Sequence, residues 1–348
     1  MEGCALFGRL MNNYYYGKSG KGDFRKEDLP ENRWQLFWDM LRTRLSALCR
    51  LNLMYVLIWL PAMIVIVVTY MSGIPNLNTI MAAQDGTLKQ MVEESAGTEN
   101  ALTYTDEQIA ELAKVNPAEY MESTVYSMLL LLIPCIAITG PFTAGVSYVI
   151  RNWARDEHAF IWSDFKDALK ENWKQGLAVS VITALVPMLV YTGWQFYGRM
   201  AAAQPVMFLP QILVLMIAVM WAICVTYVYP MMVTYQLKMK DLLRNCLLLG
   251  VARLPMSIGI RLLHCVPLLL GVALSYFWSP VYAVLIVGAY YIMIGFTLSR
   301  FVTASYTNAV FDRFLNSRIE GAKVNQGLRE TGDEDDEEDE DEETPEES

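Results

Sequence analysis

Charge is missing from two long stretches of this 348-residue chain, Met200–Leu237 and Leu262–Ser299, each with 38 residues and no Asp, Glu, Lys or Arg. Three shorter stretches lack these residues too: Leu51–Gln84, Ser123–Ile150 and Gln175–Gly198. The hydrocarbon core of a bilayer is about 30 Å thick, and about 20 apolar residues in a helix span it. A soluble core rarely needs so long an uncharged run, so these stretches predict a multi-pass membrane protein.

Histidine is scarce as well. The chain has two, His158 and His264, which are too few for a multi-histidine metal site. HExxH, paired CxxC and phosphate-binding glycine-loop motifs are also absent from the sequence. We therefore expect no cofactor and no metal, and we predict that the protein is not an enzyme. A remote alternative is an intramembrane enzyme with a dyad of Ser147 and His264, although Tyr148 stands where that motif needs glycine.

The uncharged runs predict an all-α fold: a polytopic membrane helix bundle of six transmembrane helices with cytoplasmic amphipathic helices. As a single helix, Leu262–Ser299 would measure about 57 Å, nearly twice the thickness of a bilayer core. Trp278-Ser279-Pro280 in its middle is a turn signal, so this run is predicted to form two spans. The predicted spans are residues 51–71, 124–150, 177–197, 211–237, 262–278 and 281–299.

Basic residues are distributed unevenly over the predicted loops. Of the 27 Lys and Arg residues, 24 fall on the side that carries both termini, and only Lys89, Lys114 and Arg199 fall on the other. Cytoplasmic loops are enriched in Lys and Arg, so both termini are predicted to be cytoplasmic. The largest external piece is then an acidic insertion, residues 72–122, in which Thr105–Tyr120 begins like a capped helix.

The net charge of −10 is a property of the C-terminal end, where residues 333–343 are consecutive acids and two more acids follow. This end repels itself and has no large apolar residue to bury, so residues 321–348 are predicted to be a disordered acidic tail. The rest divides into a cytoplasmic N-terminal segment with an interfacial helix, residues 1–50, and a membrane domain, residues 51–320. We expect no nucleic-acid partner.

Two cytoplasmic segments, Trp34–Leu48 and Phe160–Trp173, carry apolar residues at helical spacing with basic residues on other faces. This pattern is typical of helices that lie in the membrane interface. The alternative is that they dock a soluble partner. A cytoplasmic helix with an asparagine follows the second, fourth and sixth spans (Asn172, Asn245 and Asn308). This is a weak sign of an internal repeat of three units.

The predicted spans contain no acidic residue, which argues against a carrier that moves ions through a charge at mid-membrane. Every predicted span has a proline within it or at its end, and the densest case is the segment Thr139–Gly145 (TGPFTAG). Its small residues favour close helix packing, whereas a Gly-Pro pair within a span can free a carbonyl to face a cavity. Both interpretations remain open. The candidate residues for a cavity or a packing motif are Asn52, Thr139, Gly140, Pro141, Thr143, Asn172 and His264.

Three blocks carry a family resemblance: Leu51–Pro61 (LNLMYVLIWLP), Thr139–Gln175 (TGPFTAGVSYVIRNWARDEHAFIWSDFKDALKENWKQ), and Tyr229–Pro255, where YPMM leads to KDLLRNCLLLGVARLP. In these blocks the chain resembles the bacterial YesL-like membrane proteins, a family named for a domain of unknown function. The second block is the most specific. The chain departs from the family pattern in the wide separation of Pro61 from Thr139 and in its additional external loop and acidic tail.

The resemblance implies a link to carbohydrate uptake, because genes of this family often lie near carbohydrate-uptake systems, and it implies no established reaction. We expect a non-enzymatic accessory component associated with solute uptake. Its partners would be the lipid bilayer and a transporter complex or its cytoplasmic subunit. The alternative is a facilitative permease for a neutral small solute, with a polar cavity lined by Thr139, Thr143 and His264.

Overall fold

The computed structural model describes residues 29–96 and 101–329, and all regular structure within these residues is helical. Within these residues, six helices are long and apolar enough to cross a membrane: Arg33–Gln84, Pro117–Ala137, Ser163–Ala203, Pro205–Thr234, Leu254–Phe277 and Pro280–Arg318. The predicted all-α polytopic bundle is therefore confirmed, and the six helices indicate a membrane-embedded protein. Residues 1–28 and the acidic run 333–343 lie outside the described residues.

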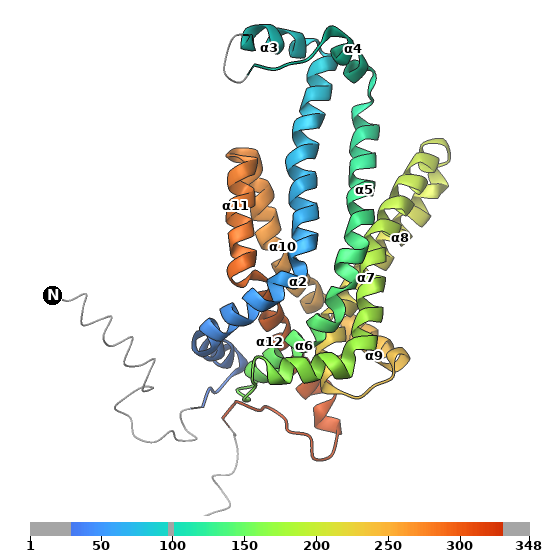
Figure 1. The fold of residues 1–348 in the computed structure, drawn as a ribbon. Coiled ribbons are helices and arrows are strands. Elements are labelled where there is room, and N and C mark those ends of the chain that lie inside the picture. The colour runs from blue at the N-terminus through green and yellow to red at the C-terminus, as the bar shows by residue number, and fades with distance from the viewer. Residues whose placement is uncertain (1–28, 97–100, 330–348) are drawn as a thin grey trace, which may run out of the picture.

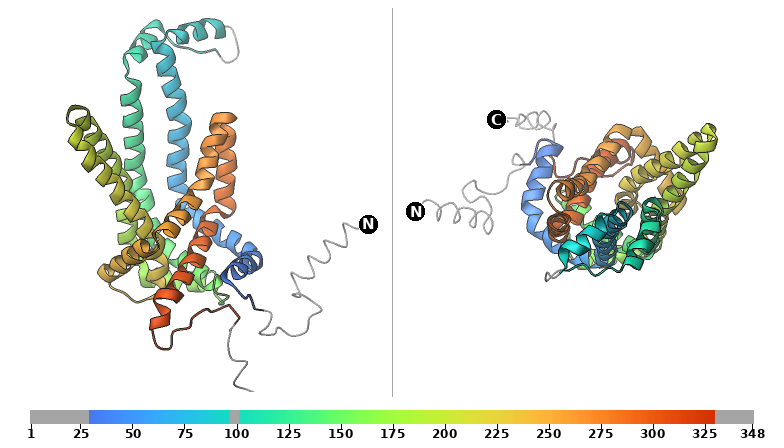
Figure 2. Two further views of the ribbon diagram at one scale, coloured as in Figure 1. Left: turned by 180° about the vertical axis from the view of Figure 1, so that it is seen from behind. Right: turned by 90° about the horizontal axis from the view of Figure 1, so that it is seen from above.

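The main helices are, in chain order, α2 (Arg33–Gln84), α3 (Thr87–Ser95), α4 (Asp106–Lys114), α5 (Pro117–Ala137), α6 (Thr139–Trp153), α7 (Ser163–Ala203), α8 (Phe208–Thr234), α9 (Met239–Ala252), α10 (Leu254–Phe277), α11 (Pro280–Tyr290) and α12 (Phe296–Phe314). Helix α2 packs beside α5, α5 beside α7, α7 beside α8, and α10 beside α11 (Figure 1). The two further views show the same arrangement, with the α10–α11 hairpin on one side of α2 and the α7–α8 hairpin on the far side of α5 (Figure 2).

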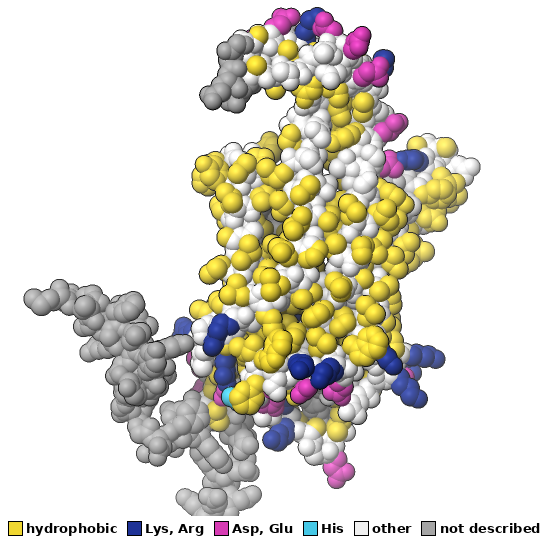
Figure 3. Space-filling model, viewed as in Figure 1, with side chains coloured by type: hydrophobic (Ala, Val, Ile, Leu, Met, Phe, Trp, Pro, Cys, Tyr) yellow, Lys and Arg dark blue, Asp and Glu magenta, His cyan; other side chains and the backbone are white. Residues whose placement is uncertain are grey.

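Charged side chains gather at the two ends of the bundle, and apolar side chains cover its middle (Figure 3). We call the end that carries α3 and α4 the acidic end. We call the opposite end, where α6, α9 and α12 lie, the basic end (Figure 1). Many of the large apolar side chains between the ends are exposed, as in α10 and α11. Such an exposed apolar belt suits contact with lipid chains.

Helix α2 has 52 residues, so it measures about 78 Å. Asn32 caps its start, since the side-chain oxygen accepts hydrogen bonds from the N–H groups of Trp34 and Gln35. The predicted interfacial segment Trp34–Leu48 and the first predicted span thus form one helix without a break. The first part of α2 turns away from the direction of the rest (Figure 1).

The cap at the acidic end contains α3 and α4. Helix α4 begins as the sequence predicts, with a capping box between Thr105 and Gln108. The predicted helix Thr105–Tyr120 does not run through, however. Pro117 has no N–H to continue the ladder, so α4 ends at Lys114 and α5 begins at Pro117 with Asn116 as its cap. The Gln84 side chain donates to the carbonyl of Val115 at 2.8 Å, which ties the end of α2 to this junction.

The second predicted span, residues 124–150, is divided into α5 and α6 at Ile138. The predicted turn in the last uncharged run is confirmed: α10 ends at Phe277 and α11 begins at Pro280, where Ser279 caps the new helix. Beyond α11 the chain passes through a π-helical segment, Tyr291–Gly295, into α12. The chain therefore continues as helix beyond the predicted end of the sixth span and reaches the basic end.

Residues 321–329, assigned to the tail from the sequence, lie against the folded body. Arg155 Nη2 donates to the carbonyl of Lys323 at 3.2 Å, and the N–H of Arg329 donates to the carbonyl of Pro30 at 3.0 Å. Gly327 has φ = +82°, and a Cβ there would lie 2.9 Å from the carbonyl oxygen of Arg155. Glycine suits this position because it adopts a positive φ without strain and has no Cβ to collide with the neighbouring segment.

Candidate functional site

The TGPFTAG segment lies where α6 crosses α7, and its first glycine is in backbone contact with the second helix. A Cβ on Gly140 would overlap the carbonyl oxygen of Gly176 and the hydroxyl of Ser180. In the reverse direction, a Cβ on Gly176 would lie 2.9 Å from the carbonyl oxygen of Gly140. The crossing is therefore a small-residue packing contact of the kind that membrane helices favour.

Pro141 explains the break between α5 and α6. It has no N–H, so the carbonyl of Ala137, four residues earlier, loses its helical partner. The hydroxyl of Ser180 on α7 donates to this carbonyl at 2.5 Å. The carbonyl that the Gly-Pro pair frees is thus used in a helix–helix hydrogen bond and does not face an open cavity.

Thr139 and Thr143 are both buried, with 2% and 1% of their surface exposed. The hydroxyls of Thr143 and Tyr55 are 2.6 Å apart, and Thr143 Oγ1 donates to the carbonyl of Thr139 at 2.8 Å. Thr139 Oγ1 donates in turn to the carbonyl of Ile136 at 2.8 Å. These hydroxyls connect α6 to α2 and satisfy backbone groups near the break.

Asn52 joins α2 to the irregular part of the last helix. Its Nδ2 donates to the carbonyls of Tyr291 and Ile292, each at 2.8 Å, and its Oδ1 accepts from the N–H of Thr297 at 3.0 Å. A π-helical segment changes the hydrogen-bond pattern of its helix. Here one fully buried amide bonds carbonyls at the start of that segment and an N–H just beyond its end. Asn52 is a structural clamp of the bundle.

His264 lies elsewhere in the bundle. Its Nε2 is 3.0 Å from the carbonyl of Ser299 and 3.4 Å from the hydroxyl of Thr303, both on α12. Ser147 Oγ is buried and has no hydrogen-bond partner within the described part of the chain. The dyad considered from the sequence is therefore not formed. The Asn172 side chain donates to the carbonyl of Ala168 at 3.0 Å, which is a hydrogen bond within its own helix and joins no second helix.

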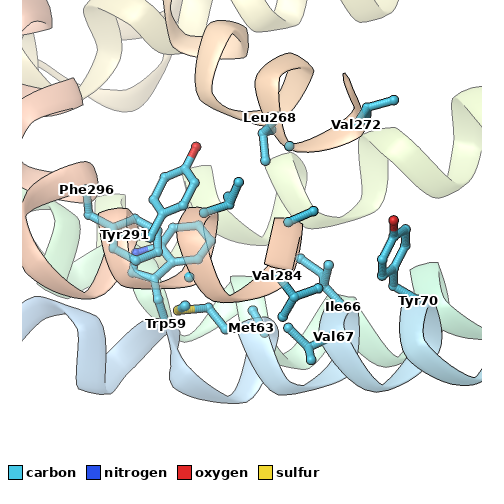
Figure 4. A pocket seen from close by; sticks show the side chains of 15 residues that line it. Trp59, Met63, Ile66, Val67, Tyr70, Leu268, Val272, Val284, Tyr291 and Phe296 are labelled. Atoms are coloured by element: carbon cyan, nitrogen blue, oxygen red, sulfur yellow. The ribbon is translucent and has the colours of Figure 1, made fainter. Parts of the chain in front are cut away.

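A cavity of about 440 Å³ lies between α2 and the α10–α11 hairpin, and it is almost entirely apolar (Figure 4). From α2 it is lined by Trp59 and Met63, from α10 by Leu268, and beyond α11 by Tyr291 and Phe296. Gly288 leaves open space in its wall, whereas a Cβ on Gly271 would lie only 2.8 Å from Val287 Cγ2. The sequence did not predict this cavity, because its lining residues come from α2, α10, α11, the π-helical segment and α12 and no local motif marks them.

The predicted site residues therefore do not form one polar cavity. Thr139, Gly140, Pro141 and Thr143 gather at the crossing of α6 with α7 and α2. Asn52 and His264 each bond a different part of the last helix. Among residues 29–96 and 101–329, no three His, Cys, Asp or Glu side chains are placed to hold a metal ion.

Comparison with known proteins gives one family. No curated protein and no solved structure matches the chain. The matching segment is residues 121–194, which includes the α6–α7 crossing and the block Thr139–Gln175. This segment is similar to a family described as "Protein of unknown function, DUF624".

Proposed function

We propose that this protein is a non-enzymatic accessory component of a solute-uptake complex, of the YesL-like type, with carbohydrate as the solute class. The observation that carries the proposal is an exposed aromatic surface at the basic end. It comprises Phe160 and Trp162, which lie just before the start of α7, and Trp173, about three turns into that helix, with exposed fractions of 62%, 64% and 48%. We call it the aromatic surface. Trp and Tyr are enriched in interfaces between proteins, where they supply much of the binding energy.

Charged residues of both signs, with Asp164, Asp167 and Glu171 among them, lie close to these rings in the sequence, and a polar rim of this kind also favours a docking role. Lys174 Nζ lies 5.7 Å from the centre of the Trp173 ring, and Lys166 and Lys170 stand on the same helix. Behind this surface Phe165 is buried, and its ring and carbonyl press on the position of Gly145 in α6. The aromatic surface is thus held on a rigid support, which lowers the entropy cost of binding.

The hydrogen bonds of the intramembrane polar residues favour this role over a facilitative permease. A permease for a neutral solute needs hydroxyl and imidazole groups directed into a passage. Thr143 and His264 instead bond Tyr55 and Ser299, and the cavity at this depth is apolar. We propose that these residues hold the bundle together.

Affinity purification of the full-length protein from its native membrane tests the proposal. We expect transporter subunits to be recovered with the wild type, and about tenfold less of them with Trp162→Ala and Trp173→Ala combined. Trp194→Ala is the matched control, because Trp194 is an exposed tryptophan on the same helix towards the acidic end. The proposal would be contradicted if no transporter subunit is recovered, or if the double variant and the Trp194→Ala control recover equal amounts. The aromatic surface would then be assigned to contact with lipid headgroups.

A further inference from the structure

A second cavity, of about 340 Å³, lies at the basic end and differs in character from the apolar one. It opens between the end of α6, the end of α8 and the segment that follows α12. Its charged lining residues are Arg151, Arg155, Glu157 and Lys323, and the remaining walls include Tyr235 and Asn316. Three cations thus face one carboxylate.

Arg151 lies in the last turn of α6 and Arg155 lies just beyond the end of that helix, and both line this cavity. Arg155 is 5% exposed, and its Nη2 donates to the carbonyl of Lys323 at 3.2 Å and to Gln326 Oε1 at 3.4 Å. Its buried Nε hydrogen-bonds no atom of residues 29–96 or 101–329. The Nε of Arg151 is buried without a partner in the same described ranges, although its Nη1 donates to Asn152 at 3.0 Å.

The available carboxylates do not neutralise this pair. Glu157 Oε1 is 3.8 Å from Arg155 Nε, which is an ion pair without a hydrogen bond. Asp312, the buried acid nearby, is occupied by Arg33 at 2.5 Å and by Asn316 Nδ2 at 2.6 Å. Burial and the guanidinium of Arg155 both lower the pKa of Arg151. An uncompensated buried charge is costly, and an anion in the cavity would offset that cost.

The walls of the cavity are fixed in place. Tyr235 donates to Asn316 Oδ1 at 2.6 Å, and the N–H of Asn325 donates to Asp312 Oδ2 at 3.2 Å. These bonds hold the end of α8 and the segment after α12 in position relative to one another. Donors that are already oriented lose little freedom when a ligand arrives.

We propose that this cavity binds a phosphate group. Guanidinium groups match phosphate oxygens with parallel hydrogen bonds, and the unpartnered Nε atoms of Arg151 and Arg155 supply donors for such bonds. The cavity volume is large enough for a phosphate that carries a small organic group. The phosphate can come from a soluble phosphate ester or from the headgroup of a phospholipid with net negative charge. The site does not depend on the proposed role in uptake.

Thermal unfolding of the full-length protein in phosphatidylcholine nanodiscs tests the site. Inorganic phosphate is titrated at constant ionic strength, with chloride as the exchanged ion. In a separate series, phosphatidylglycerol replaces part of the phosphatidylcholine. A saturable rise of the midpoint with phosphate assigns the site to a soluble ligand. A rise with phosphatidylglycerol alone, lost in Arg151→Gln, assigns it to a lipid headgroup.

Three variants test whether the residues that line the cavity determine the affinity for phosphate. Arg151→Gln is expected to weaken phosphate binding about tenfold, because one charge-assisted bidentate contact is lost. Glu157→Gln is expected to tighten it about threefold, because the one opposing carboxylate is removed. Arg318→Gln, an exposed arginine at the same end that does not line the cavity, is expected to leave it unchanged.

The Glu157→Gln variant keeps the test decisive if Arg151→Gln fails to fold. Tighter binding in Glu157→Gln supports the site, since a merely structural change would weaken binding or leave it unaltered. The proposal is overturned if neither phosphate nor phosphatidylglycerol raises the midpoint. It is equally overturned if Arg151→Gln and Arg318→Gln respond alike, because the effect would then be a general response to anions.

Discussion

Gly140 and Gly176 meet backbone to backbone where α6 crosses α7, and neither position has room for a side chain. The contact lies beside the break at Pro141, where Ser180 of α7 hydrogen-bonds the carbonyl that the proline frees. Close approach and the repaired hydrogen bond depend on each other, because Ser180 reaches Ala137 only if the two helices touch. The segment similar to the family of unknown function contains all of these residues. The segment that is similar to this family therefore includes a close helix–helix packing contact.

We predict that Gly140→Ala lowers the free energy of unfolding by about 3 kcal/mol, at the upper end for overpacking, because the new methyl group meets backbone atoms that cannot rotate away. Gly259→Ala is the matched control, since a Cβ there meets nothing within 4 Å and alanine favours a helix. Unfolding of the two purified variants in the same detergent measures the difference. Equal stability of the two variants would show that the crossing is looser than the structure describes.

Sequence reasoning predicted the architecture because each span leaves a strong local signal. The hairpin at Trp278-Ser279-Pro280 is set by a turn motif, and the start of α4 is set by a capping box; both are local. The break at Pro117 was missed, although Asn116-Pro117 carried the signal for it. A proline preceded by a good cap residue starts a new helix more readily than it continues one.

The candidate residues show that local sequence signals do not determine which distant residues a side chain contacts. Thr139, Gly140 and Thr143 were identified from the sequence, but whether they face a cavity or another helix depends on Tyr55 and Gly176, which lie far along the chain. The cavity at the basic end combines Arg151 with Lys323 in the same way. Its signal in the sequence was two arginines four residues apart, one in the last turn of α6 and one just beyond it. The excess of positive charge is evident only when the segment after α12 closes the cavity.

We predict that Asn52→Leu lowers the free energy of unfolding by about 3 kcal/mol, because the change leaves the carbonyls of Tyr291 and Ile292 and the N–H of Thr297 without their buried partner. Asn172→Leu is the control. Its amide bonds only its own helix, so the expected change is within about 0.5 kcal/mol. Chemical denaturation of both variants in detergent compares them. A change in Asn172→Leu as large as that in Asn52→Leu would mean that bonds between helices are not what makes Asn52 important.

We predict that the basic end faces the cytoplasm, because the excess of Lys and Arg on that end sets orientation. Cysteines placed at Glu107 in α4 and at Glu171 in α7, in a variant whose native cysteines are replaced by alanine, report on the two ends. Both positions are exposed, so a thiol there is accessible to a reagent on its own side. A membrane-impermeant maleimide is expected to label Glu107→Cys in intact cells and Glu171→Cys only after the cells are permeabilised. Labelling of Glu171→Cys in intact cells would reverse the orientation. It would also place the aromatic surface and the arginine-lined cavity outside, where no cytoplasmic transporter subunit and no cytoplasmic phosphate ester can reach them.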